Sequence, residues 1–251
     1  MATQTALLID CMEYMRTVPD KYFDLAVVDP PYGIGITGTP GGENKQQIPF
    51  GGIGGAKAFG KGGGKKVITP KSYHPFDDQK PPDAEYFSEL KRVSKNQIIW
   101  GGNYFLDHLG ATPCLLCWDK GRVDLNFADG EFAWTSFRSP ARICRYKWNG
   151  LLQENMANKE RRIHPTQKPV DLYRWIYARY AKPGDKILDT HLGSGSSRIA
   201  AYDAGLDFVG CEIDKYYFTE QEKRWAAYTS QMSLFVDAPQ EVIECNIDPV
   251  V

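Results

Sequence analysis

The sequence has no apolar run long enough to cross a membrane, and its first residues show neither the basic head nor the cleavage site of a secretory signal. It also has no cysteine pattern typical of a disulfide framework, because the six cysteines are scattered through segments that look like strands or helices. Cys114 and Cys117 have metal-like spacing, but no second pair follows, and the leucines between them favour a buried strand. We therefore expect a cytoplasmic protein without a metal centre.

The sequence likewise has no excess of charge of either sign, because 30 lysines and arginines face 31 aspartates and glutamates. A DNA-binding site would therefore have to be a local patch. Residues 138–168 form a segment rich in bases, with Tyr146 and Trp148 interleaved. Runs of charge are usually solvated surface, so both interpretations stay open. The candidate DNA-binding residues are Arg138, Arg142, Arg145, Lys147, Arg161 and Arg162.

The length of 251 residues suits one large α/β domain. Continuous apolar runs predict strands at 25–28, 97–100, 114–118, 186–189 and 208–212. Helical spacing and capping signals predict helices at 12–17, 82–93, 197–204, 216–228 and from 170 onward. Because strands alternate with helices, we expect a mostly parallel, twisted sheet with helices on both faces. We expect a single domain over 1–236 and a loose tail at 237–251.

Two segments are predicted to be irregular. Residues 37–66 carry many glycines and few apolar side chains to bury, which predicts a mobile loop. This loop could be a simple insertion or a functional lid, and the sequence favours neither. Residues 119–163 are polar and aromatic without a clear period, so we expect no regular structure there.

A strand-to-glycine-loop-to-helix pattern near the carboxyl terminus predicts a nucleotide-like ligand. Gly193 and Gly195 let the backbone approach a ligand, and Glu212 ends the next strand about twenty residues later, where it can take the hydroxyls of a ribose. The fuller dinucleotide pattern is missing, because Arg198 stands where a third glycine would be. Asp189 suits an ammonium and a sulfonium better than a pyrophosphate. The pattern thus favours S-adenosylmethionine over NAD.

The stretch Asp29, Pro30, Pro31 and Tyr32 follows a predicted buried strand. An exocyclic amino group of a base is a poor nucleophile, and a carboxylate with a fixed carbonyl can accept its two N–H bonds and aim its lone pair. Asp29 would supply the carboxylate, and Pro30 a carbonyl that the prolines hold rigid. Tyr32 would stack on an extruded base. The same residues also make an ordinary proline-rich turn, so the stretch is informative only together with the glycine loop.

The order of these motifs resembles the permuted, beta-type class of amino-methylating DNA methyltransferases, which occur in restriction–modification systems, phages and mobile elements. Asp29 to Gly33 come first, His164-Pro165-Thr166-Gln167-Lys168-Pro169 come late, and the glycine loop and Glu212 come last. The resemblance implies a Rossmann-like, S-adenosylmethionine-dependent fold with circularly permuted motif order, acting on double-stranded DNA in a bacterial cytoplasm. Asp-Pro-Pro-Tyr implies adenine N6, because cytosine N4 enzymes more often begin with Ser. Cytosine N4, RNA or protein amide substrates, and an inert DNA-binding subunit are the alternatives.

The resemblance also implies roles for single residues. Asp29, Pro30, Pro31 and Tyr32 would form the target-base site. Residues 120–163 would serve as a small target-recognition region, whose shortness suggests a short DNA target, a homodimer or a partner subunit; a cognate restriction endonuclease could accompany the chain. His191 departs from the family, standing where an aromatic residue would flank the cofactor, and a purely structural role is an equal alternative. The implied cofactor-binding residues are Asp10, Cys11, Thr166, Lys168, Asp189, His191, Gly193, Ser194, Gly195, Glu212 and Ile213.

Overall fold

A computed structural model describes residues 2–34, 73–74, 80–121, 128–149 and 152–233. The glycine-rich segment 37–66 and the tail 237–251 lie outside the described residues. The central element is an eight-stranded sheet with the order β1-β10-β9-β2-β3-β5-β4-β6. In that order the strands are β1 (Gln4–Leu8), β10 (Asp207–Glu212), β9 (Lys186–Asp189), β2 (Phe23–Val28), β3 (Ser94–Trp100), β5 (Gly130–Thr135), β4 (Leu116–Asp119) and β6 (Arg142–Arg145).

The sheet is mostly parallel, as the sequence predicts. All pairings from β1 to β3 are parallel, and β5 alone among these eight strands runs against its neighbours. A separate hairpin joins β7 (Trp148–Asn149) to β8 (Leu152–Gln153). The expectation that 119–163 has no regular structure is therefore wrong, since β5 and β6 belong to the main sheet. Non-local pairing with β3 and β4 makes β5 a strand, and no local period announces it.

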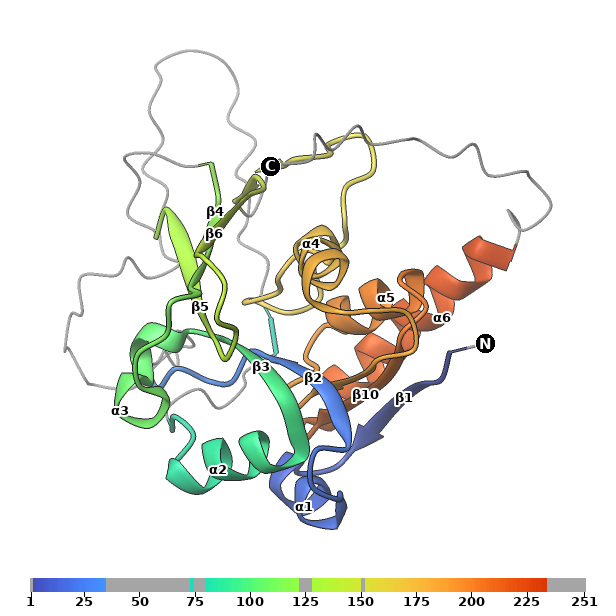
Figure 1. The fold of residues 1–251 in the computed structure, drawn as a ribbon. Helices are drawn as coiled ribbons and strands as arrows, with labels where there is room; N and C mark the ends of the chain where they lie inside the picture. Colours follow the sequence, from blue (N-terminus) through green and yellow to red (C-terminus); the bar gives the residue numbers. More distant parts are fainter. Residues whose placement is uncertain (1, 35–72, 75–79, 122–127, 150–151, 234–251) are drawn as a thin grey trace, which may run out of the picture.

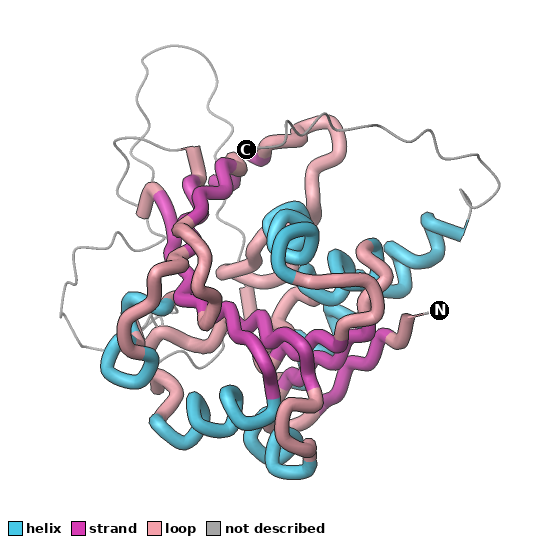
Figure 2. The backbone as a smooth tube through the Cα atoms, viewed as in Figure 1, coloured by secondary structure: helices cyan, strands magenta, loops and turns pink. Residues whose placement is uncertain are grey.

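Helices cover both faces of the sheet (Figure 1). On one face lie α1 (Cys11–Thr17), α2 (Ala84–Val93) and the short α3 (Leu106–Leu109), which follows a 3-10 turn η1 (Gly102–Tyr104). On the other lie α4 (Val170–Tyr180), α5 (Ser196–Asp203) and α6 (Lys215–Ser233). Figure 2 shows the strands as one band between the two helical layers. No helix among the described residues is long and apolar enough to span a membrane.

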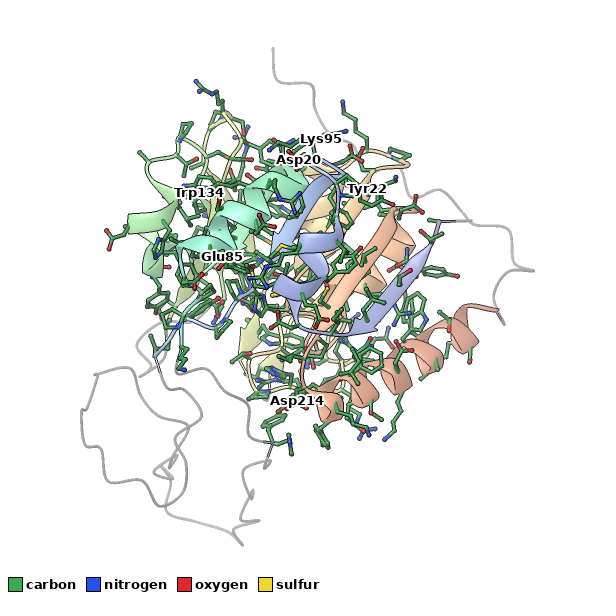
Figure 3. All side chains as sticks on the ribbon, turned by 90° about the horizontal axis from the view of Figure 1, so that it is seen from below. Asp20, Tyr22, Glu85, Lys95, Trp134 and Asp214 are labelled. Carbon is green, nitrogen blue, oxygen red and sulfur yellow. The ribbon has the colours of Figure 1, made fainter. Side chains whose placement is uncertain are left out.

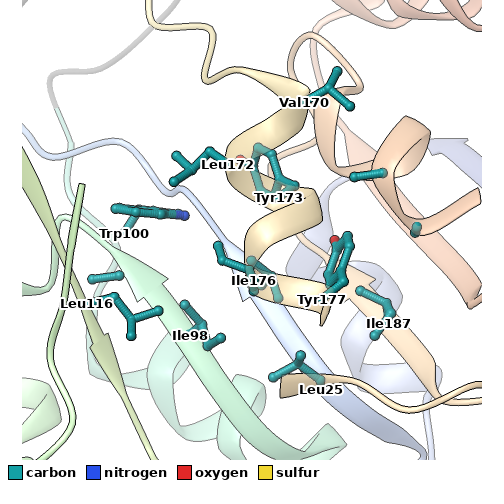
Figure 4. Close-up of a cluster of buried hydrophobic side chains, with 14 of the residues drawn as sticks. Leu25, Ile98, Trp100, Leu116, Val170, Leu172, Tyr173, Ile176, Tyr177 and Ile187 are labelled. Atoms are coloured by element: carbon teal, nitrogen blue, oxygen red, sulfur yellow. The ribbon is translucent and has the colours of Figure 1, made fainter. Parts of the chain in front are cut away.

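Each face of the sheet carries its own buried apolar cluster. On the α4 face, Leu172 and Ile176 lie four positions apart on one side of the helix, and the buried Tyr177 lies next to Ile176. They pack over Leu25 and Ile187 of the parallel strands (Figure 4). Full burial of such a side chain contributes about 1.5–3 kcal/mol, so this stripe fixes α4 and the segment that enters it.

The topology places the ends of the strands where a ligand is expected. From β9 the chain passes through α5 to β10 on one side, whereas from β2 it passes through α2 to β3 on the other. Sheets of this kind bind ligands outside the carboxyl ends of the strands at such a switch point. Figure 3 shows the two ends: Asp214 lies just beyond the carboxyl end of β10, and Asp20, Tyr22 and Lys95 lie at the amino ends.

Candidate active site

Four acids predicted from the sequence, Asp10, Glu212, Asp189 and Asp29, end neighbouring parallel strands. Glu212 of β10 pairs with Leu8 of β1, so Asp10 lies two residues beyond it. Leu188 of β9 pairs with Ala26 of β2, so Asp29 similarly projects two residues beyond the level of Asp189. Because neighbouring strands lie about 4.8 Å apart, the four carboxyl groups line one edge of the sheet.

Both oxygens of the Asp29 carboxylate have a side-chain donor. Its Oδ1 accepts a hydrogen bond of 2.6 Å from the Tyr32 hydroxyl, and its Oδ2 lies 2.5 Å from the Lys168 ammonium. Lys168 also donates to the Tyr32 hydroxyl over 3.2 Å, which closes a triangle of three side chains. Only 4% of the Lys168 side chain and 18% of the Asp29 side chain are exposed. The structure thus joins two motifs that lie 139 residues apart in the chain.

Glu131 of β5 is a second acid at this position, and the sequence analysis missed it. Its Oε2 lies 3.1 Å from the Lys168 ammonium, and its Oε1 pairs with Lys120, which follows β4. Burial alone would raise the pKa of Glu131, but the two lysines outweigh burial and lower it to about 2. Burial likewise disfavours the charged form of Lys168, and the carboxylates of Asp29 and Glu131 nevertheless hold its pKa above the usual value. Glu131 and Lys168 are therefore both charged at neutral pH.

The ring of Tyr32 is held on a glycine turn. Gly101 has a φ of 69°, and a Cβ there would lie 2.2 Å from a Tyr32 ring carbon, so both the backbone and the space require glycine. Tyr104 stacks on Tyr32 with ring centroids 5.0 Å apart and an interplanar angle of 19°. Burial, with the neighbouring Asp29 carboxylate, raises the pKa of Tyr32 well above its ordinary value. Tyr32 is therefore a neutral hydrogen-bond donor with a fixed ring.

The glycine loop closes around Glu212. The backbone N–H groups of Gly193 and Asp214 donate to Oε2 and Oε1 of this carboxylate over 2.8 Å and 2.9 Å. Gly193 and Gly195 have φ values of 50° and 72°, and Gly195 caps α5. Ser194 between them is buried. Burial raises the pKa of Glu212, and no cation lies within ion-pair distance of it among the described residues.

Asp189 is buried at the end of β9 and is also held without a cation. It accepts hydrogen bonds from the backbone N–H of His191 over 3.0 Å and from the Ser197 hydroxyl. Burial outweighs these bonds and raises its pKa to about 7. His191 packs edge-on against the Tyr86 ring at 5.6 Å, and burial lowers its pKa to about 4, so its imidazole is neutral. Tyr86 also bonds the Thr190 hydroxyl, a contact that the sequence did not indicate.

The remaining predicted residues of this edge are more open. Asp10 caps α1 by accepting from the N–H groups of Met12 and Glu13. Cys11 is half-buried, and burial with the adjacent Asp10 raises its pKa to about 12, so it is a neutral thiol. Ile213 beside Glu212 is 70% exposed and presents an apolar side chain at this polar edge.

Thr166 and Lys168 belong to a segment tied down at several points. The Thr166 hydroxyl lies 3.0 Å from Nδ1 of His164, and the indole of Trp148 donates to the Gln167 carbonyl over 3.0 Å. Burial, together with nearby Lys168 and Arg162, lowers the pKa of His164 to about 3. The structure brings Thr166 close to His164, and brings the Lys168 ammonium to Asp29.

The candidate DNA-binding residues do not form one cluster. Arg138 follows β5, which runs antiparallel to β3 and has already passed Gln97 at Ser136, so Arg138 lies towards the amino end of β3. Arg145 ends β6 beside Asp119, with which it pairs over 3.5 Å, at the carboxyl-end side. Arg142 starts β6 opposite Leu116, and Lys147 follows β6; both are exposed. Arg161 is exposed, and Arg162 is half-buried and donates to the Pro165 carbonyl.

Comparison with known proteins finds DNA methyltransferases. A family model described as DNA methylase matches residues 88–223. Type II methyltransferase M.HinfI of Haemophilus influenzae is 24% identical over 260 residues, covering 88% of this chain and 67% of that protein. Type II methyltransferase M2.DpnII of Streptococcus pneumoniae is 39% identical over 83 residues, which cover 32% of this chain and 30% of that protein.

Solved structures share the fold. The M1.HpyAVI complex with S-adenosylmethionine has a TM-score of 0.50 at 18% identity, over 88% of this chain and 98% of that one. TTHA0409 of Thermus thermophilus, complexed with S-adenosyl-L-methionine, has a TM-score of 0.53 at 14% identity, over 90% and 95%. The cytosine-N4-specific PvuII DNA methyltransferase has a TM-score of 0.52 at 12% identity, over 89% and 87%.

These solved structures confirm the expected methyltransferase fold. Together with the family they support S-adenosylmethionine as the cofactor. The family model spans more than half of the chain and includes β9, the glycine loop and Glu212. The chain belongs to the N6/N4 DNA methylase family.

Proposed function

We propose that this protein transfers a methyl group from S-adenosylmethionine to the N6 amino group of an adenine extruded from duplex DNA. The observation that carries the proposal is the position of Asp29. It ends β2 at the switch point, next to β9 with its glycine loop, in contact with Tyr32 and Lys168. A carboxylate at that edge can contact a base while it lies next to the cofactor site.

The residues of β9 and β10 fit the proposed cofactor. Each oxygen of the Glu212 carboxylate accepts one backbone N–H and keeps a further lone pair for a ribose hydroxyl. The exposed Ile213 offers an apolar surface for a flat ring, and Asp189 offers a carboxyl group suited to an ammonium. When bound there, S-adenosylmethionine would supply its sulfonium methyl group, and the neutral thioether S-adenosylhomocysteine would be the leaving group.

The chemistry of the target side falls to Asp29 and Pro30. Asp29 accepts one N–H of the exocyclic amino group, and the Pro30 carbonyl accepts the other. These acceptors pull the nitrogen towards tetrahedral geometry and turn its lone pair to the methyl group. Pro31 restricts the backbone of Pro30 to an extended conformation, so the carbonyl is oriented before the base arrives. Tyr32 offers a ring on which the base stacks.

The choice of adenine rests on the tetrapeptide. Asp29, Pro30, Pro31 and Tyr32 match the form that the resemblance associates with adenine N6, and cytosine N4 is the alternative product. DNA contacts are proposed for the bases on the carboxyl-end side of the sheet, Arg145, Lys147, Arg161 and Arg162. Arg138 lies at the other end and is not expected to contribute. The homodimer, the cognate restriction endonuclease, the cytoplasmic location and the role of 120–163 in target recognition stay predictions.

Single-molecule sequencing of plasmid DNA tests the proposal. The protein is expressed in a methylation-free host, and modified bases are recorded in every sequence context, with Asp29→Ala as the control. N6-methyladenine at one short motif, absent with the variant, is the expected result. N4-methylcytosine would replace the adenine assignment, and unmodified DNA would overturn the proposal in favour of RNA, a protein amide or an inert subunit.

A further inference from the structure

The most informative group at the site is the buried Lys168 ammonium, because it touches two carboxylates at once. It lies 2.5 Å from Oδ2 of Asp29 and 3.1 Å from Oε2 of Glu131. It also lies 5.4 Å from the centre of the Trp100 ring, so one side of the cation faces an aromatic surface. Its surroundings are therefore fixed on several sides by β2, β3 and β5.

The contact with Asp29 conflicts with the proposed reaction. An ammonium and an exocyclic amino group are both N–H donors, and both need the same carboxylate. With Tyr32 on Oδ1 and Lys168 on Oδ2, each oxygen of Asp29 already has a side-chain donor. Each oxygen can accept a second donor, but the ammonium at 2.5 Å holds Oδ2 through a charge-assisted bond, so the amino group of a base competes with Lys168 for that oxygen. A buried ammonium without an anionic partner is strongly destabilised, so Lys168 needs another anion within reach when it leaves Asp29.

Glu131 meets that need. We propose that Lys168 occupies the acceptor position of Asp29 while the target-base site is empty, and that it moves onto Glu131 when the amino group of the base enters. This inference rests on the proposed function and adds a positioning role for Glu131, which touches neither base nor cofactor. The exchange conserves charge, because Lys168 stays paired with one carboxylate throughout and Asp29 changes only its donor.

Lys120 completes the arrangement. Its ammonium pairs with the other oxygen of Glu131 and lies 4.8 Å from the centre of the Trp118 ring. Glu131 therefore stays ionised and in place whether or not Lys168 approaches it further. A carboxylate held this way presents its Oε2 to Lys168 as a fixed second position. Oε2 has no hydrogen bond of good geometry, only the 3.1 Å ion contact, so it has capacity to accept one.

The test is a double-mutant cycle on methylation of the DNA motif found by sequencing. Glu131→Gln removes the second anion, so Lys168 stays on Asp29 and competes with the base. We expect kcat/KM for DNA to fall at least tenfold, with the dissociation constant for S-adenosylmethionine unchanged. Lys168→Met in the same chain removes the competitor. The double variant Glu131→Gln/Lys168→Met should then be at least fivefold more active than Glu131→Gln.

That rescue separates the proposal from a merely structural ion-pair network. If Glu131 only supports the fold, Lys168→Met should lower the activity of the Glu131→Gln variant further. A double variant that is no more active than Glu131→Gln therefore overturns the inference. An unchanged kcat/KM for DNA in the Glu131→Gln variant also overturns the inference. Glu131→Asp keeps the charge and should recover part of the activity, which guards against a folding defect in the amide variant. Glu220→Gln, which breaks an exposed pair with Lys223, is the matched control and should leave activity unchanged.

The outcomes also distinguish this inference from the proposed function. A wild-type protein that methylates DNA while its variants lose activity additively refutes the role of Glu131 alone. A wild-type protein that methylates no DNA overturns the proposed function, and this inference with it.

Discussion

The acids of this sheet edge are held in two different ways. Asp10, Asp189 and Glu212, which we call the amide-held acids, receive backbone N–H groups and form no ion pair among the described residues. Asp29 and Glu131, the lysine-held acids, pair with Lys168 and Lys120. A backbone N–H group cannot move away from the carboxylate that it binds, whereas a lysine side chain can rotate away from its carboxylate. The first arrangement suits a cationic ligand that arrives into an unpaired site, and the second suits an exchange of donors.

Burial shows the same contrast. The pKa of Asp189 is raised to about 7 because its burial is not offset by a positive charge, whereas the lysines lower the pKa of Glu131 to about 2. Buried Asp189 thus has no compensating cation among the described residues, whereas buried Glu131 has two. The predictions that follow test whether the two kinds of acid behave differently.

Asp29→Ala should have the largest effect and should separate chemistry from cofactor binding. Loss of one preoriented hydrogen-bonding group costs about 10²–10³ in rate, and Asp29 also orients the base, so we expect kcat to fall about a thousandfold or more. Calorimetry should give an unchanged dissociation constant for S-adenosylmethionine. An equal loss of kcat and of affinity for S-adenosylmethionine would move Asp29 to the cofactor site. It would also remove the contrast between the amide-held and the lysine-held acids.

Glu212→Ala should show the opposite pattern. It removes two hydrogen-bond acceptors for the ribose, each worth about 1 kcal/mol net, so we expect S-adenosylmethionine to bind about 10- to 100-fold more weakly. At saturating cofactor, kcat should recover most of its wild-type value. Glu220→Gln, an acid on the surface of α6, is the control. An unchanged affinity would remove Glu212 from the cofactor site.

The affinity for S-adenosylmethionine should rise with pH through the titration of Asp189. With a free-protein pKa of about 7, this acid is protonated at lower pH and must lose a proton to receive an ammonium. The dissociation constant should therefore fall by up to about tenfold per pH unit between pH 5 and 7 and level off above. Calorimetric titrations with S-adenosylmethionine, in buffers of different ionisation enthalpy, measure the proton that is released on binding. Asp189→Asn should abolish this dependence, and a slope that survives the substitution would assign it to another group.

The smallest effect is expected at the DNA surface. Replacing Arg161 or Arg145 by Gln should reduce the slope of log affinity against log salt by about 1, if each contacts one phosphate. Arg138→Gln, at the opposite end of the sheet, should leave the slope unchanged. Fluorescence anisotropy with duplex DNA over a range of salt concentrations measures this slope. An equal reduction of the slope by Arg138→Gln would contradict the assignment of DNA to the carboxyl-end side.

The parts of this molecule that the sequence predicts well are those with local signals. The strands β2, β9 and β10 are continuous apolar runs that end in an acid, and the structure places them within two residues of the prediction. The capping signal of Asp83 similarly predicts the start of α2. The carboxyl ends of parallel strands meet at one edge of a sheet, which explains why Asp10, Asp29, Asp189 and Glu212 lie together in the structure.

The partners of these acids could not be predicted, because they depend on contacts between distant segments. Lys168 meets Asp29 across 139 residues. Glu131 reaches the site only because β5 lies between β3 and β4 and turns this side chain inward. In the sequence it stands in a polar, aromatic stretch, and the run of β-forming residues after Gly130 is the only signal that could have located it.

The charge state of Lys168 has a consequence for the chain itself. An unprotonated lysine amine is a better nucleophile than the amino group of a base, and it would compete for any methyl donor bound beside it. Asp29 and Glu131 keep the pKa of Lys168 above its usual value, so the lone pair carries a proton and cannot attack. We therefore expect the ion pairs of Lys168 to protect this buried amine from methylation.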